Sequence, residues 1–117
     1  MRYLLLICTD ESGFEAESPE ETAQMTEGYM SFIGEMTERG VLQGGERLRP
    51  TSTATTVQRR GDEVLTADGP FAETKEQVAG YFQVDCADLD EAIEIASKIP
   101  AAQFGTIEVR PIWEVSM

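Results

Sequence analysis

The amino-acid sequence predicts an α+β fold, in which an antiparallel sheet carries two helices on one face. Two segments with helical periodicity and capping residues alternate with stretches of strand composition. The first of these stretches is a run of apolar residues and the last contains a proline, which assigns the two strands to different places in the sheet. The length of 117 residues suits one domain, expected to cover residues 1–117.

The first strand is predicted at residues 2–8, where RYLLLIC is continuously apolar rather than alternating. Such a run is typical of a central strand that is covered on both faces. Residues 9–17 are acidic and polar and contain Gly13, so a loop is expected to follow the strand.

The first helix is predicted to begin after Ser18, with Pro19 at its first position and Glu21 completing a capping box. Gly40 is expected to end it. Apolar residues recur at helical spacing, which predicts one face packed against the sheet. They are Met25, Tyr29, Phe32, Ile33 and Met36.

The middle of the chain is expected to contain strands and turns. Residues 41–48, with Gly44–Gly45, predict a short strand or a bend. Residues 53–59 and 63–66 predict a β-hairpin that turns at Gly61–Asp62.

Residues 79–86 alternate in polarity and predict another strand. Its two faces carry Phe82, Val84 and Cys86 on one side, and Tyr81, Gln83 and Asp85 on the other. A second helix is expected after a cap at Asp88 and before Pro100. Its predicted apolar stripe consists of Leu89, Ala92, Ile93, Ala96 and Ile99.

The last strand is predicted at residues 106–114 and at an edge of the sheet, because Pro111 cannot donate to a ladder. The order strand–helix–strand, hairpin, strand–helix–strand folds most simply as a ferredoxin-like sandwich with an inserted β-hairpin. In this topology the first and third main strands are central, and both helices lie on one face.

The other face of that sheet also needs cover, because the apolar run at residues 4–7 has side chains on both sides. Burying one large aliphatic side chain is worth about 1.5–3 kcal/mol, so several exposed ones are unfavourable. We expect a homodimer in which two sheets pack face to face. The alternative is that the inserted hairpin folds over this face.

Two cysteines and no histidine limit the chemistry. Cys8 and Cys86 lack the spacing of a zinc site and should lie at opposite ends of antiparallel strands, about 20 Å apart, so two free thiols are expected. Without histidine the chain lacks the commonest transition-metal ligand and the usual general base near neutral pH. Neither a metal site nor a cofactor is expected.

The chain is strongly acidic, with 9 Lys and Arg against 22 Asp and Glu and a net charge of −13. This charge argues against nucleic acid or an anionic membrane surface as the main partner. There is no apolar run of membrane-spanning length and no visible secretory signal, so a cytoplasmic location is expected.

The densest polar cluster begins at Asp68 and continues through the charged residues 73–76. A carboxylate at a strand end can act as a general base or hold a ligand hydroxyl, so Asp68 is the catalytic candidate. The alternative is a structural role, in which Asp68 accepts backbone N–H groups of the turn. The candidates for a pocket rim or an interface are Gly69, Pro70, Phe71, Glu73 and Lys75.

Arg47, Arg49, Arg59 and Arg60 lie in a stretch without acidic residues. Guanidinium groups suit a small carboxylate or phosphate ligand, and pairing with the protein's own carboxylates is the alternative. Glu108 and Arg110 share a face of the last strand. They could line a cavity between two subunits, or they could form an ion pair with little effect on stability. The candidate ligand-binding residues are Arg47, Arg49, Tyr81, Glu108 and Arg110.

The segment DGPFAETKEQVAGY, residues 68–81, resembles the signature of the DGPF subfamily of YCII-related proteins. The resemblance extends to the opening MRYLLLI, to GVL and GGE within residues 40–46, to the hairpin and to the closing GTIEVRPI. It implies a dimeric α/β barrel of ferredoxin-like protomers. Relatives are proposed to be enzymes with a His–Asp pair, of which only the carboxylate, Asp68, is present here. Many are encoded near extracytoplasmic-function sigma factors, which implies a regulatory or accessory role.

Two functions remain open. The first is binding of a small polar or anionic molecule in a cleft near residues 68–76, with Asp68 as an acid–base group. It predicts a cavity that holds Asp68 and Arg110 together. The second is a non-catalytic dimeric module, in which the same loop builds a protein interface.

Overall fold

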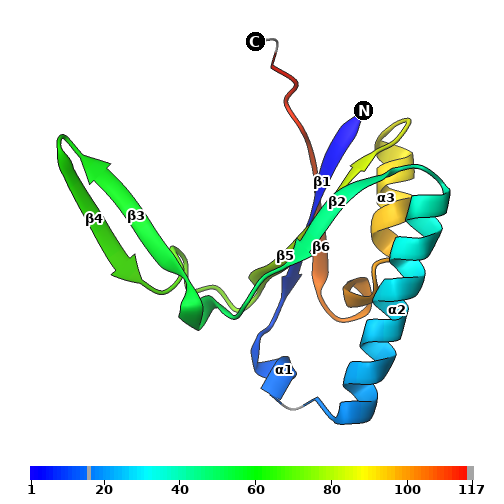
Figure 1. Cartoon of the computed structure of the whole chain (residues 1–117), viewed down its shortest axis with the longest axis horizontal. Helices are drawn as coiled ribbons and strands as arrows, with labels where there is room; N and C mark the ends of the chain where they lie inside the picture. The colour runs from blue at the N-terminus through cyan, green and yellow to red at the C-terminus, as the bar shows by residue number, and fades with distance from the viewer. Residues whose placement is uncertain (16, 116–117) are drawn as a thin grey trace.

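The computed structural model describes residues 1–15 and 17–115 and has the predicted α+β class (Figure 1). The predicted helices and strands follow one another in the expected order, and the short helix α1 and two 3₁₀ helices are added. The elements are β1 (Arg2–Thr9), α1 (Ser12–Glu15), α2 (Pro19–Glu38), β2 (Leu42–Arg47), η1 (Thr51–Thr53), β3 (Thr55–Arg60), β4 (Glu63–Asp68), β5 (Gln77–Asp85), α3 (Leu89–Ser97), η2 (Pro100–Gln103) and β6 (Thr106–Pro111).

Four strands form one open antiparallel sheet in the order β2-β5-β1-β6. The first strand is central and the last lies at an edge, as predicted. Pro111 is paired opposite Tyr3, and because β6 has a single neighbour, its lack of an N–H affects only one ladder. Strands β3 and β4 form a separate two-stranded sheet.

The core lies between this sheet and the helices α2 and α3, which cover the same face (Figure 1). Alternate residues of β1 point into it, and Leu5 is fully buried. Phe82 of β5 packs its ring against Phe32 of α2, with ring centroids 4.9 Å apart. The face of β1 that carries Leu5 is therefore the one covered by helices.

The helix boundaries confirm the capping signals in the sequence. The side chain of Ser18 accepts a hydrogen bond from the Glu21 amide at 3.1 Å, and Asp88 accepts one from the Glu91 amide at 2.9 Å. Gly40 follows α2 with a φ of 74°, a left-handed conformation that favours glycine.

Three local expectations need correction. The predicted loop at residues 9–17 contains the short helix α1, and the last strand ends at Pro111 rather than at residue 114. The buried side of α3 is formed by Ala92, Ile95 and Ala96, whereas Leu89 and Ile93 are exposed. Two apolar stripes at helical spacing overlap in α3, one through Leu89 and Ile93 and one through Ala92, Ile95 and Ala96. The second stripe faces the sheet, and the buried Ile99 continues it.

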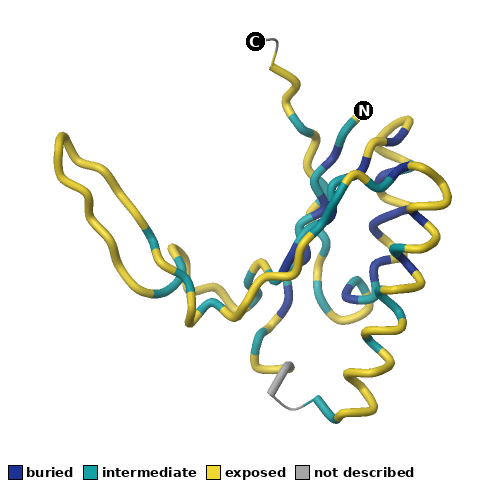
Figure 2. Tube along the Cα trace, viewed as in Figure 1, coloured by how far each residue is buried: buried dark blue, intermediate teal, exposed yellow. Residues whose placement is uncertain are grey.

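The hairpin β3–β4 leaves the sheet and extends away from the body of the molecule, on the side opposite to the helices (Figure 1). Every residue of β4 is exposed, and so is every residue of β3 except Thr56 (Figure 2). The radius of gyration is 16.3 Å, against about 13 Å for a compact chain of this length. The alternative that the hairpin folds over the open face of its own sheet is therefore wrong.

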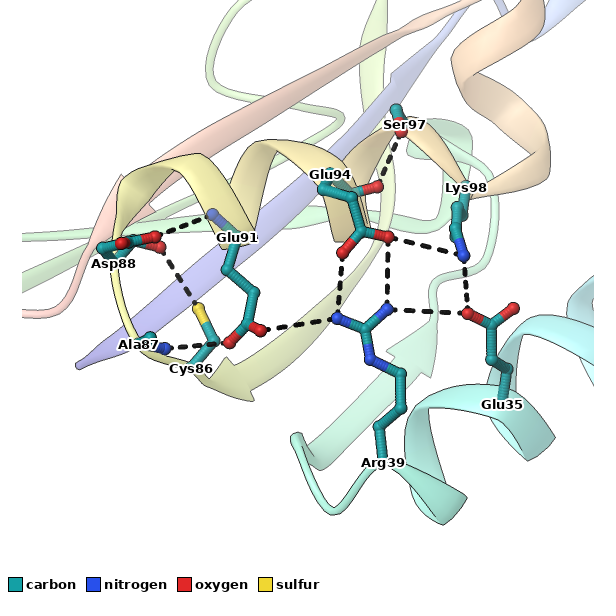
Figure 3. A network of polar contacts seen from close by, with 9 residues as sticks. All are labelled: Glu35, Arg39, Cys86, Ala87, Asp88, Glu91, Glu94, Ser97 and Lys98. Carbon is teal, nitrogen blue, oxygen red and sulfur yellow. Dashed lines mark hydrogen bonds and ion pairs between the residues drawn. The ribbon is translucent and has the colours of Figure 1, made fainter.

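A network of ion pairs joins the end of α2 to α3 (Figure 3). Arg39 donates from both terminal nitrogens to the Glu94 carboxylate, at 2.9 and 3.2 Å, and Lys98 donates to Glu35 at 2.7 Å. The hydrogen bond from Lys98 lowers the pKa of Glu35 below its ordinary value of 4.5, and the one from Arg39 does the same for the pKa of Glu94. Both carboxylates are thus held in their charged form in the folded protein.

We expect this network to make the free energy of unfolding depend on pH in the acid range. Since the folded pKa values of Glu35 and Glu94 are lowered, their contribution is present above 4.5 and is lost as pH falls below it. The double variant Arg39→Gln/Lys98→Gln should lose less stability than wild type on going from about pH 5 to about pH 3. Urea midpoints across this range measure the difference, and parallel pH profiles would contradict it.

Candidate functional site

One group of predicted residues lies on the face of the sheet that no helix covers. Leu4 and Leu6 of β1 alternate with the buried residues of that strand and are half-buried on this face. The strand register places Leu4 between Gln83 and Arg110, and Leu6 between Tyr81 and Glu108. The open face is therefore a short apolar strip with polar and charged side chains on both sides.

Arg110 and Glu108 form an ion pair within β6. One terminal nitrogen of Arg110 donates to both carboxylate oxygens of Glu108 at 3.0 Å. Both side chains are well exposed, and a pair of this kind contributes little to stability in water. The two groups remain accessible to a ligand or to a second protein surface.

A second group of predicted residues lines a hollow of about 710 Å³ at the base of the hairpin. Its walls come from the end of β1, the segment from β2 to η1, and the loop between β4 and β5. Six of the predicted residues meet there, from two segments of the chain that are 20 positions apart in the sequence. They are Arg47, Arg49, Gly69, Pro70, Glu73 and Lys75.

Two carboxylates in the hollow are already bound by the protein. Glu11 accepts hydrogen bonds from the Thr51 amide at 2.8 Å and from its hydroxyl at 2.6 Å. Asp10 accepts from the hydroxyl and the amide of Ser12, at 2.7 and 3.0 Å, and these bonds lower its pKa, with Lys75 adding a smaller attraction. Asp10 and Glu11 were not among the predicted site residues; their position just after a central strand was the available signal.

Asp68 is exposed at the end of β4, opposite Thr55. The turn that follows is fixed by Gly69, whose amide donates to Ala54 at 2.8 Å and whose φ is 97°. Asp68 and Arg110 are not among the residues that line the hollow. The site residues thus fall into two groups, one at the hairpin base and one on the open face.

The two thiols are free, as expected. Cys8 is half-buried at one end of β1. Cys86 is buried at the other end of β1, where its amide donates to the Met1 carbonyl. Burial raises the pKa of both thiols, and the carboxylate of Glu108 raises that of Cys8 further. The pKa of neither thiol is thus lowered in the way that marks a reactive thiolate.

Within residues 1–15 and 17–115, no three His, Cys, Asp or Glu residues are grouped as ligands of a metal ion. Among the described helices, none combines the length and the apolar character needed to cross a membrane.

An open antiparallel sheet with helices on one face, and a hollow lined by both cationic and acidic side chains at the base of a hairpin, define a small α+β protein. The sequence profile of the YCII-related domain matches residues 1–116. A protein of Rhizobium meliloti (strain 1021), named "Uncharacterized protein R00369", is 40% identical over 114 residues, which cover 96% of this chain and 92% of that protein. The chain belongs to the YCII-related family, and the resemblance noted in the sequence is confirmed at that level.

Proposed function

We propose that the protein binds a small anionic molecule in the hollow at the base of the hairpin. The observation that carries this proposal is the convergence of Arg47, Arg49 and Lys75 on one hollow of a protein with a net charge of −13. Glu11 and Asp10, which also line it, are occupied by hydrogen bonds from Thr51 and Ser12. These hydrogen bonds use acceptor positions of the two carboxylates and leave fewer for the cations, while both groups keep their negative charge.

Arg49 and Lys75 are the groups best placed to meet the ligand. In the described part of the chain, neither makes an ion pair with a carboxylate within 4.0 Å. A guanidinium fork binds a carboxylate or a phosphate through two parallel hydrogen bonds, and an ammonium adds a point charge. Glu73, on the same rim, would favour a ligand that also carries a donor group. Asp68 as an acid–base group on such a ligand remains a prediction.

The test uses inorganic phosphate and succinate as probes in isothermal titration calorimetry. We expect Arg49→Gln to weaken binding about tenfold or more, because a charge-assisted hydrogen bond contributes about 1.5–3 kcal/mol. Arg60→Gln is the matched control, since Arg60 ends β3 and does not line the hollow. Equal affinities of the two variants, or no binding of either probe to the wild-type protein, would contradict the proposal.

We further propose that two copies pair through the open faces of their sheets, in the ferredoxin-like, dimeric α/β-barrel arrangement that the DGPF resemblance implies. The support is the strand order with both helices on one face, and the strip of Leu4 and Leu6 that no helix covers. Pairing would enclose Tyr81, Glu108 and Arg110 between the subunits. Light scattering should then give about twice the protomer mass of 12.9 kDa.

The second candidate function is a non-catalytic regulatory or accessory module, linked to an extracytoplasmic-function sigma factor system. Phe71, in the loop after β4, and Trp113, after β6, are each 89% exposed. Exposed aromatic side chains are favoured at protein interfaces. The calorimetric test separates the two candidates, since this one predicts no small-molecule binding at the hairpin base.

A further inference from the structure

The hollow at the base of the hairpin carries charged side chains of both signs. Among the described residues, its lining includes three carboxylates and three cations, which are Asp10, Glu11 and Glu73, and Arg47, Arg49 and Lys75. A ligand with negative charge alone would be attracted by half of these groups and repelled by the other half. It would also be repelled by a protein with a net charge of −13. The lining therefore matches a ligand that carries both signs of charge.

The two signs of charge come from different walls of the hollow. The end of β1 contributes Asp10 and Glu11, whereas the segment from β2 to η1 contributes Arg47 and Arg49. Thr51 ties these two walls together, because its amide and its hydroxyl both donate to Glu11. The third wall, the loop between β4 and β5, contributes one group of each sign. A dipolar ligand would therefore bind in one preferred orientation, with its anionic end toward the arginines.

Asp10 has one carboxylate oxygen available for a ligand. Both hydrogen bonds from Ser12 go to Oδ1, and within residues 1–15 and 17–115 no hydrogen bond reaches Oδ2. Lys75 attracts the Asp10 carboxylate and helps to lower its pKa, yet the two groups form no ion pair within 4.0 Å in this part of the chain. Asp10 can thus accept a hydrogen bond from a cationic group of a ligand while Lys75 meets an anionic one.

We propose that the ligand of the hollow is a small organic zwitterion, in which a short carbon chain joins an ammonium group to a carboxylate or a phosphate. Arg49 and Lys75 bind the anionic group, and Asp10 accepts from the ammonium group, with Glu73 on the rim. The volume of about 710 Å³ lies within the range of about 300–1,000 Å³ that is usual for sites of organic ligands. Apolar side chains for the carbon chain come from Leu48, Pro50, Pro70 and Ala79. The proposal rests on the anion site proposed above and names the class of its ligand.

Two pairs of ligands of equal size test the proposal on the wild-type protein by isothermal titration calorimetry. O-Phosphoethanolamine differs from propyl phosphate only by an ammonium group in place of a methyl group, and β-alanine differs from butyrate in the same way. We expect the ammonium member of at least one pair to bind about tenfold or more tightly than its methyl analogue. The phosphate pair and the carboxylate pair distinguish the two kinds of anionic group.

The same titrations separate this proposal from the anion site on which it rests. If neither ammonium compound binds more tightly than its analogue, the zwitterion proposal is wrong. The anion site then still stands, provided that propyl phosphate or butyrate binds and that Arg49→Gln weakens this binding. If none of the four compounds binds, both proposals are wrong.

Asp10→Asn tests the role of this residue, because it removes the charge and retains an oxygen that can accept from Ser12. We expect it to weaken binding of the preferred ammonium compound about tenfold or more, and not to weaken binding of its methyl analogue. Asp62→Asn is the matched control, since it removes the same charge at the turn of the hairpin, outside the hollow. Glu73→Gln, in an exposed loop, should show the same selective loss without touching α1. Equal losses for both ligands in the Asp10 variant, with no selective loss in the Glu73 variant, overturn the proposal.

Discussion

Replacing Gly45 by alanine is expected to destabilise the protein by about 1–3 kcal/mol or more, because it forces an extra methyl group into a filled space. Gly45 lies in β2 beside β5, and a Cβ atom there would come within 2.5 Å of a ring carbon of Phe82 and 2.7 Å of the Tyr81 carbonyl oxygen. The oxygen belongs to the backbone of a central strand, which cannot move without breaking its ladder. Urea denaturation measures the loss.

The matched control is Gly34→Ala. Gly34 lies inside α2 and is exposed, and apart from its chain neighbours and the adjacent helix backbone no atom lies within 4 Å of the added methyl group. Alanine is favoured over glycine in a helix interior, so this variant should be more stable than wild type by about 0.5–1 kcal/mol. Opposite signs for the same chemical change separate close packing from backbone entropy. If both variants lose stability equally, the inference that β2 and β5 approach too closely at Gly45 for a side chain is wrong.

Replacing Leu5 by alanine should lower the free energy of unfolding by about 2–5 kcal/mol, the range for a fully buried leucine. Leu5 is 0% exposed and lies among side chains of both helices and the sheet. The neighbouring Leu6 points to the open face and is half-buried in the protomer. These two leucines are therefore chemically identical probes of opposite faces of one strand.

Leu6→Ala should have a smaller effect on the protomer and should weaken self-association instead. Chemical denaturation at several protein concentrations, with light scattering in native buffer, distinguishes the two effects. A loss of stability that is equal for the Leu5 and Leu6 variants, and independent of protein concentration, would contradict the assignment of Leu6 to a dimer face.

The elements that were predictable from the sequence are those fixed by short-range chemistry. Ser18 and Asp88 cap helices because their side chains accept from amides three residues further on, and this spacing is visible in the sequence. The alternation in β5 likewise separates Phe82, in the core, from Tyr81, on the open face. Such features require no knowledge of distant parts of the chain.

The features that were missed depend on contacts between distant segments. Two apolar stripes fit α3, and only the position of the sheet decides that Ile95 is buried while Ile93 is exposed. Glu11 belongs to the hollow because Thr51, 40 residues away, donates to it. The direction in which the hairpin leaves the body follows from the chain at its base, for which no local sequence rule exists. For this reason Asp68 and Arg110 could be placed on their strands but not relative to each other.

Strands β3 and β4 have one neighbour each, so both outer edges of the hairpin present unpaired amide and carbonyl groups. Such edges are templates on which further chains can add, strand upon strand, into an open-ended fibre. The tip of the hairpin carries charges of both signs, on Arg59, Arg60, Asp62 and Glu63. Charged side chains on exposed strands oppose this growth, because like charges meet when identical hairpins stack in register. Concentrated salt screens that repulsion. We therefore expect the solubility of the protein to fall as ionic strength rises.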